Sequence, residues 1–267
     1  MNLRRTYAIA LRHAYLVRGS ISRLMPMFSW VLVDMVLWGF ITKFLNHVTQ
    51  SGYNFVAAML GAVLLWDFYI RVMQGVTMAF FEDVWSRNFL NVFASPIRIS
   101  EYVSGLVVSS IATSSVGLGV MLLVTTTVFG LSFFAYGIAL LPFFLVLFTS
   151  GIALGIAAAG MVLRLGPASE WFVWPIPALL SPFAGVFYPL STLPVWMQYI
   201  GRALPPAYVF EAMRAIVGGG AVDWSKLAIS IAMSAGHVVL ASWYFTAMYR
   251  QAVRTGLIAR YSAESIS

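Results

Sequence analysis

Residues 181–214, SPFAGVFYPLSTLPVWMQYIGRALPPAYVFEAMR, are strongly apolar but carry prolines at positions 182, 189, 194, 205 and 206. Proline lacks a backbone N–H and clashes with the preceding helical turn, so these positions exclude one continuous helix. The uninterrupted pieces, 195–203 and 208–217, are also too short to cross a bilayer, which takes about 20 residues. Apolar but repeatedly broken chain is typical of a re-entrant or interfacial segment that packs against protein beside a membrane.

The chain as a whole has the composition of a membrane protein. It has 267 residues, of which 61% are hydrophobic and 9% charged, whereas soluble domains are about 25% charged. We expect an all-α polytopic membrane protein forming one transmembrane domain, 1–267, with an N-terminal segment 1–23, a core 24–248 and a tail 249–267. Six transmembrane helices are predicted, at 24–45, 53–80, 102–129, 136–163, 171–188 and 226–248.

The distribution of basic residues predicts the orientation. Six spans place both termini on one side, and most of the 16 lysines and arginines fall in the segments on that side. The positive-inside rule then places both termini in the cytoplasm and the proline-broken segment outside, between the fifth and sixth spans. Because the arginines flank apolar spans, the net charge of +7 favours a lipid bilayer as partner and not nucleic acid.

Residues 1–23 have the pattern of an amphipathic helix and not of a signal peptide. An apolar face that includes Leu3 and Tyr7 lies opposite Arg5 and Arg12. Two interpretations remain open, namely a helix lying on the membrane surface or a basic flank that only sets topology.

A second short amphipathic helix is predicted within residues 80–105, FFEDVWSRNFLNVFASPIRISEYVSG. Its apolar positions have helical spacing, polar residues lie between them, and Ser95-Pro96 ends it. An apolar ridge with a charged rim suits docking in a groove of another protein. The alternative is a surface helix that packs only at its own lipid interface.

Charged residues within the predicted spans need partners. Asp67 and Arg71 are four residues apart and suited to pair with each other, whereas Asp34 has no basic neighbour on its own span. These residues are either a structural pair or part of a substrate or proton path. Elsewhere, Gly151-x-x-x-Gly155 indicates close helix packing within the chain, and Glu211 and Arg214 have the spacing of a local ion pair.

Cysteine is absent, and the three histidines are scattered without the spacing of metal ligands, so we expect no metal site. No group of nucleophile and base stands out either, so the chain is not expected to be an enzyme.

Two motifs resemble those of type 2 ABC exporter permeases, and with six spans the resemblance covers nearly the whole chain. The first is the acidic pair Glu82-Asp83 followed by Leu90, Ser95-Pro96 and Glu101-Tyr102. The second, between the fifth and sixth spans, consists of Gly185, Phe187, Pro189, Leu193-Pro194 and Leu204-Pro205-Pro206.

The resemblance implies partners and site residues. In this family the loop between spans two and three is a coupling helix that contacts the ATPase, which here implies contacts from Glu82, Asp83, Arg87, Phe89, Leu90, Phe93 and Pro96. The chain has no G-x-x-x-x-G-K-[ST] motif, so ATP and Mg are expected on a separate P-loop ABC ATPase, in two copies, and no cofactor on this chain. A homodimer would enclose a pathway with Asp34, Asp67, Arg71, Phe183 and Phe187, and an external gate of Gly185, Pro189, Pro194, Pro205, Glu211 and Arg214.

The expected function is the permease subunit of an ATP-driven ABC exporter in the cell (inner or plasma) membrane. It would move an amphiphilic or drug-like small molecule or a lipid out of the cytoplasm or the inner leaflet. Export of a polysaccharide or lipo-oligosaccharide by the same machinery is the alternative. An ion-coupled transporter with Asp34 and Asp67 as proton sites, and a membrane-embedded enzyme, are further hypotheses.

Overall fold

The computed structural model describes residues 2–18, 21–49, 55–86 and 88–257, without the side chains of residues 17–18, 21–28, 31, 90 and 135. All regular elements within these ranges are helices, which confirms the predicted all-α class. In chain order they are α1 (Leu3–Arg18), α2 (Ile21–Thr49), η1 (Val56–Leu60), α3 (Gly61–Trp85), α4 (Phe89–Ala94), α5 (Ile99–Phe129), η2 (Phe133–Ala139), α6 (Leu140–Leu165), η3 (Pro167–Phe172), α7 (Ile176–Ala184), η4 (Leu190–Thr192), α8 (Val195–Arg202), α9 (Pro205–Val217) and α10 (Trp224–Arg254).

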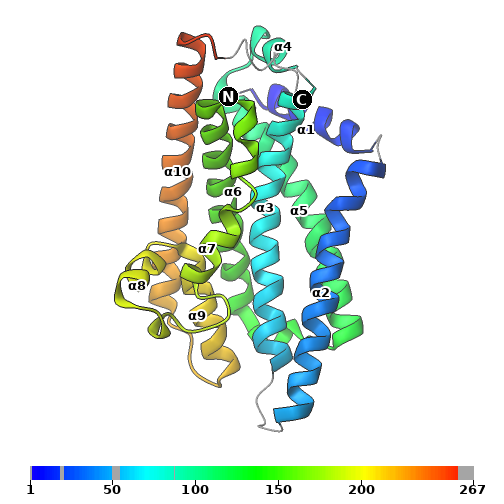
Figure 1. Cartoon of the computed structure of the whole chain (residues 1–267), viewed down its shortest axis with the longest axis vertical. Coiled ribbons are helices and arrows are strands. Elements are labelled where there is room, and N and C mark those ends of the chain that lie inside the picture. The colour runs from blue at the N-terminus through cyan, green and yellow to red at the C-terminus, as the bar shows by residue number, and fades with distance from the viewer. Residues whose placement is uncertain (1, 19–20, 50–54, 87, 258–267) are drawn as a thin grey trace.

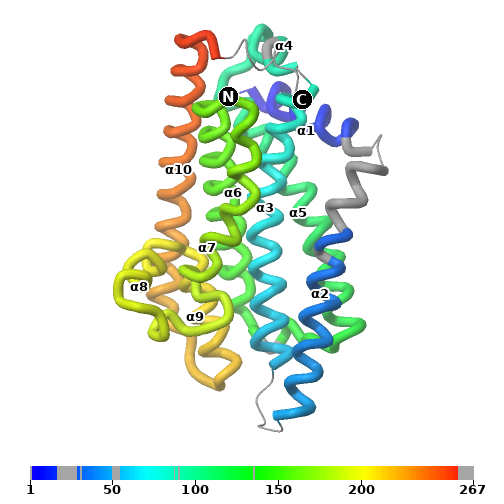
Figure 2. The backbone as a smooth tube through the Cα atoms, in the orientation of Figure 1, coloured from blue at the N-terminus to red at the C-terminus, as the bar shows by residue number. Residues whose placement is uncertain are grey.

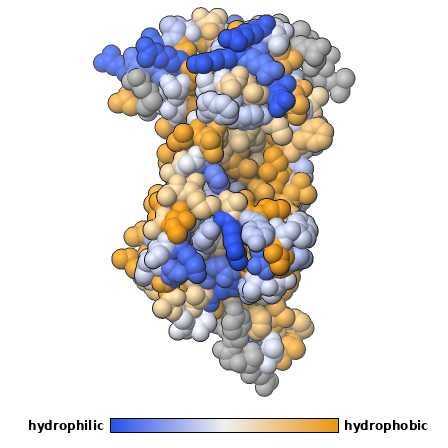
Figure 3. Space-filling view, turned by 90° about the vertical axis from the view of Figure 1, so that its left-hand side faces the viewer, coloured by the Kyte–Doolittle hydropathy of each residue, from blue (hydrophilic) through white to orange (hydrophobic). Residues whose placement is uncertain are grey.

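The long helices form a bundle in which α6 packs against α10 and α3, and α3 packs against α5 (Figure 1). Among the described residues, four helical stretches are long and apolar enough to cross a membrane: Val56–Trp85, Ile99–Phe129, Tyr136–Leu165 and Trp224–Arg254. On the face shown in Figure 3, an apolar belt separates a hydrophilic cap from a region of mixed polarity. A bundle with such a belt is suited to the hydrocarbon core of a bilayer.

Two of the predicted spans differ from these four. Helix α2 is continuous over 29 residues and covers the first predicted span. The predicted fifth transmembrane helix, 171–188, is instead divided into the end of η3, a turn and the nine-residue α7. Pro175 and Pro177 explain the division, since proline cannot donate within a helix. A nine-residue helix is about 14 Å long, so the six-span topology stays a prediction.

Close packing of α3 and α6 depends on two glycines. A Cβ atom on Gly151 would lie 2.9 Å from the Val72 Cβ, and one on Gly155 would lie 2.7 Å from the Val76 Cβ and 2.8 Å from the Met73 carbonyl oxygen. The missing side chains let the two helix backbones approach within the same chain. This confirms the predicted role of Gly151-x-x-x-Gly155 in intrachain packing.

The ends of the bundle differ in composition. Helix α4, the start of α1 and the last turns of α10 lie at one end, whereas α8 and α9 lie toward the other (Figures 1 and 2). The predicted amphipathic segment that contains α4 and the proline-broken segment that contains α8 and α9 therefore lie far apart along the bundle. That the α4 end is cytoplasmic stays a prediction from the charge distribution.

Candidate functional site

Asp83 lies in the last turn of α3 and is completely buried. Its Oδ2 accepts a hydrogen bond of 2.8 Å from the Tyr102 hydroxyl of α5, and the carboxylate forms an ion pair with Arg12 of α1. Asp83 thus joins three helices. Its side chain does not reach the surface of the chain, so its expected part in coupling to an ATPase stays a prediction and would act through the helices that it joins.

His13 of α1 completes this buried cluster. Its Nδ1 lies 3.1 Å from the Ser109 Oγ, and its Nε2 lies 3.8 Å from the Asp83 Oδ2. The Ser109 hydroxyl donates to the Gly105 carbonyl, so Ser109 accepts the proton on the His13 Nδ1. Burial and the nearby charge of Arg12 lower the pKa of His13 to about 4, against a smaller raising effect of the Ala79 backbone.

Acidification should therefore loosen α1. The folded chain keeps His13 neutral down to about pH 4, whereas the unfolded chain takes up this proton near pH 6.5. Protons then favour the unfolded state between these values, and lowering the pH from 6.5 to about 5 should cost about 2 kcal/mol. Melting temperatures of the detergent-purified chain across this range measure the effect.

The variant His13→Asn keeps a donor near Nδ1 and removes the titration, so its melting temperature should fall less on acidification. His237→Asn, a change at a half-buried histidine of α10, should retain the pH dependence of the unmodified chain. Identical pH profiles for His13→Asn and the unmodified chain would show that another group is responsible.

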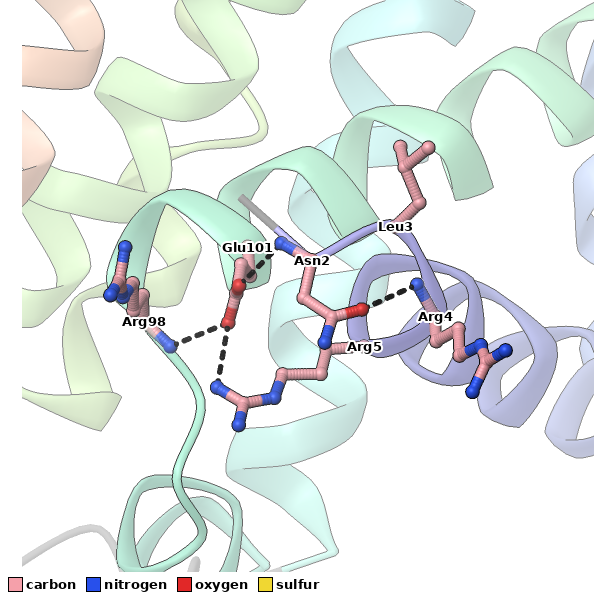
Figure 4. A pocket seen from close by; sticks show the side chains of 6 residues that line it. All are labelled: Asn2, Leu3, Arg4, Arg5, Arg98 and Glu101. Atoms are coloured by element: carbon pink, nitrogen blue, oxygen red, sulfur yellow. Dashed lines mark hydrogen bonds and ion pairs between the residues drawn. The ribbon is translucent and has the colours of Figure 1, made fainter.

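Glu101, also buried, joins the beginnings of α1 and α5 (Figure 4). Its Oε1 accepts the Asn2 backbone N–H at 2.7 Å, and its Oε2 accepts the Arg98 backbone N–H at 3.0 Å and lies 3.5 Å from the Arg5 Nη1. A carboxylate is favourable at a helix N-terminus, where free N–H groups and the helix dipole are positive. Glu101 therefore holds α1 against the start of α5, at the edge of a shallow polar pocket that Arg4 also lines.

Helix α4 is shorter than predicted and has only six residues. Its apolar ridge points into the bundle: Phe89 is buried, its ring centroid 5.7 Å from that of Phe80, and the Phe93 ring lies 4.6 Å from Tyr249 of α10. Phe89 and Phe93 therefore anchor α4 to its own chain, and their expected role in coupling to an ATPase stays a prediction. Glu82 is half-buried and belongs to α3.

The outward side of this end consists of Asn91, Ala94 and Pro96, which are all exposed. We define these three residues as the α4 surface. Of the residues predicted to contact the ATPase, only Pro96 belongs to it; Arg87 and the side chain of Leu90 lie outside the described residues. The α4 surface is thus small, but it is fixed from behind by the aromatic contacts of Phe89 and Phe93.

The charged residues within the bundle are not paired as predicted. No hydrogen bond or ion pair joins Asp34 or Asp67 to any residue that the structure describes, and one Asp67 oxygen is buried without a partner. Arg71 is buried too, and its Nε has no hydrogen-bond partner in the described part of the chain. Placing a charged side chain at the bilayer centre costs about 2.5–3.5 kcal/mol. Leaving these groups unpaired is therefore unfavourable, and packing alone does not explain why they are present.

At the other end, Arg214 of α9 holds the turn after α7. Its Nη1 donates to the carbonyl oxygens of Gly185 at 2.7 Å and of Val186 at 3.3 Å, and its Nη2 donates to the Glu211 Oε1 at 3.0 Å. The same Glu211 oxygen accepts the Leu190 backbone N–H at 2.8 Å. Gly185 has φ of 60°, a left-handed conformation that favours glycine. The predicted Glu211–Arg214 ion pair is confirmed, and it also fixes the turn.

The prolines of this segment mark the boundaries of its elements. Pro189 directly precedes η4, Pro194 directly precedes α8, and Pro205 opens α9. Proline is tolerated in a first helical turn because the N–H that it lacks would be unpaired there. The proline pattern therefore predicted the short elements correctly, and their expected role as an external gate stays a prediction.

Phe183 and Phe187 connect this segment to its neighbours. Phe187 stacks on Trp38 of α2, with ring centroids 4.9 Å apart and planes at 14°, and Phe183 contacts Trp196 of α8 edge to face at 6.2 Å. A Cβ on Gly201 would lie 2.5 Å from the Phe183 carbonyl oxygen, so α8 and α7 pack backbone against backbone. Movement of this segment would therefore be transmitted to α2.

A helical bundle with an apolar belt, a short anchored helix at one end and a proline-broken segment toward the other is the architecture of an integral membrane protein. The chain belongs to the ABC-2 type transporter family, whose profile matches residues 14–217. It is thus an integral membrane permease subunit of an ABC transporter, a family that works with an ABC ATPase, and the predicted family is confirmed. No curated protein matches the chain.

The sequence pattern missed the importance of α1. Arg12 was placed with Arg5 opposite the apolar face, His13 was only counted among three scattered histidines, and Glu101 and Tyr102 had no role beyond the family motif. In the structure Thr6, Ile9 and His13 face inward, while Leu3 and Tyr7 are exposed. One signal was present, since Asp83 lies among strongly apolar neighbours on α3 and needed a basic partner from another segment.

Proposed function

We propose that this chain is the permease of an ATP-driven exporter that moves an amphiphilic or drug-like small molecule or a lipid out of the cytoplasm or the inner leaflet. The observation that carries the proposal is the family match together with α4, which stands at one end of the bundle with its aromatic ridge anchored in the core. ATP and Mg would bind to a separate ATPase, and the membrane would be the cell membrane.

The α4 surface is the proposed contact for the ATPase. Phe89 contacts Phe80 of α3 and Tyr102 of α5, and Phe93 contacts Tyr249 of α10. A displacement of α4 would therefore act on three long helices at once, because densely packed side chains transmit strain. This supports α4 as the element that couples ATP hydrolysis to movement of the bundle.

A second copy of the chain would complete the pathway. Large apolar side chains of α2 are exposed at helical spacing and form one stripe along the helix: Trp30, Val33, Leu37, Phe40 and Phe44. We propose that this stripe lies near the centre of a homodimer. The partly accessible Asp34 is next to it in the helix, and the Trp38–Phe187 stack leads toward the proposed external gate.

The α4 surface can be tested by one substitution with a matched control. Ala94→Arg introduces a long cation on the exposed side of α4, and Ala203→Arg introduces it at an exposed position beside α8. The ATPase that copurifies with the tagged chain from native membranes should decrease at least about tenfold with Ala94→Arg, equivalent to about 1.4 kcal/mol, and stay unchanged with Ala203→Arg.

Two outcomes would count against this proposal in different ways. Equal recovery of the ATPase with both variants would remove the α4 surface from the interface. Failure of the unmodified chain to recruit any P-loop ATPase would overturn the function as an ATP-driven permease.

A further inference from the structure

The middle of the bundle contains two carboxyl groups that form no hydrogen bond or ion pair with any residue that the structure describes. Asp34 lies near the middle of α2, and Asp67 lies near the middle of the Val56–Trp85 stretch. The helices α2 and α3 contact each other, and the two carboxylates are close enough to repel one another electrostatically. A pair of like charges in this position favours a positively charged group between them.

The chain itself supplies too little positive charge at this place. Asp67 attracts Arg71, but no ion pair within 4.0 Å joins them, and the Arg71 side chain lies against the bare Gly117 of α5, where a Cβ would come 2.2 Å from its Cδ. Among the residues that the structure describes, one oxygen of Asp67 and the Nε of Arg71 are both buried without a hydrogen-bond partner. Two carboxyl groups thus lie near one guanidinium that forms an ion pair with neither of them.

Aromatic side chains flank the accessible carboxylate. Trp30 and Trp38 lie four residues before and after Asp34, so all three share one face of α2. Trp30 is 73% exposed, and Asp34 is only half-buried, so a ligand in the proposed pathway between two copies would have access to both. The face of tryptophan attracts cations, and its large apolar surface suits a hydrophobic ligand.

We propose that Asp34 and Asp67, flanked by Trp30 and Trp38, form a binding site for lipophilic cations and that these are the class of substrate that the permease exports. The inference rests on the proposed function, since a substrate presupposes a transporter. The ligand's positive charge replaces the missing partner of the two carboxylates, and its apolar groups lie along the tryptophans of α2. Neutral and anionic amphiphiles of the same size lack the electrostatic interaction with Asp34 and Asp67.

The test compares two probes of equal size and opposite charge, tetraphenylphosphonium and tetraphenylborate. The full-length chain in phosphatidylcholine nanodiscs should bind tetraphenylphosphonium saturably, beyond the uptake by empty nanodiscs, and should not bind tetraphenylborate in this way. This comparison needs no substitution and therefore does not depend on how a variant folds. Equal saturable binding of both probes, or of neither, would overturn the inference.

Substitutions then locate the site. Asp34→Asn and Asp67→Asn should each raise the Kd for tetraphenylphosphonium at least about tenfold. The control Asp223→Asn removes the same charge from an exposed position at the start of α10 while keeping a residue that can cap the helix, and it should leave the Kd unchanged. A Kd within about twofold of the unmodified value in the Asp34→Asn, Asp67→Asn double variant would overturn the assignment.

The two proposals fail separately. A chain that recruits its ATPase but does not discriminate between the two probes would overturn only the cation site. A chain that binds tetraphenylphosphonium through Asp34 and Asp67 but recruits no ATPase would retain the site and overturn the proposed ATP-driven function.

Discussion

Asp83→Ala should lower the free energy of unfolding by about 3–5 kcal/mol, because it leaves Arg12 without its buried counter-charge and the Tyr102 hydroxyl without an acceptor. The loss should be concentrated in α1, which depends on Asp83 for its attachment to α3. The melting temperature of the purified chain measures the overall effect, and hydrogen exchange of the α1 amides shows whether this helix detaches first.

The double variant Arg12→Met, Asp83→Leu distinguishes the effect of leaving one buried charge unpaired from the effect of losing side-chain packing. It removes both charges and fills the space with apolar atoms, so most of the stability should return. Asp223→Ala, at an exposed ion pair with Lys226, should be much less destabilising, because it removes only a solvent-exposed ion pair and a helix cap. If Asp83→Ala is no worse than Asp223→Ala, then the buried cluster does not hold α1 in place.

Gly155→Leu should prevent the bundle from forming. Even a methyl group at this position would lie 2.8 Å from the Met73 carbonyl oxygen, which belongs to the backbone and cannot turn aside. Gly155→Ala should therefore cost about 1–3 kcal/mol through overpacking, and the larger leucine should cost more. The yield of monodisperse protein and its melting temperature measure the two variants.

The matched control is Gly119→Leu in α5, where an added Cβ meets no atom within 4 Å. Because leucine is a better helix former than glycine, this variant should be neutral or slightly more stable. A chain in which Gly155→Ala keeps its melting temperature but loses self-association would show that the motif joins two copies and not α3 to α6.

The elements that could be predicted from the sequence are those with local causes. The prolines at 189, 194 and 205 exclude hydrogen bonds within their own turns, so the short helices α8 and α9 follow from the sequence directly. The Glu211–Arg214 pair is likewise a matter of spacing along one helix. The family resemblance rested on these local patterns, and the family match includes them.

The elements that could not be predicted depend on contacts far apart in the sequence. The spacing of Phe89 and Phe93 predicts an apolar ridge but does not say whether the ridge faces a partner or its own bundle. In the structure it faces inward, because Phe89 packs against Phe80 and Phe93 packs against Tyr249. Asp83 was assigned to the surface because charges are exposed by default. Only its position against Arg12 of α1 explains why a charge is buried there.

The attachment of α1 also has a consequence for the order of biosynthesis. Asn2 and Glu101 are 99 residues apart, and His13 and Ser109 are 96 apart. At about 5–20 residues per second, the ribosome completes the binding partners of α1 several seconds after α1 itself. Helix α1 is thus synthesised before the residues against which it packs, and its exposed Leu3 and Tyr7 give it an apolar face that can contact the membrane surface until they are present.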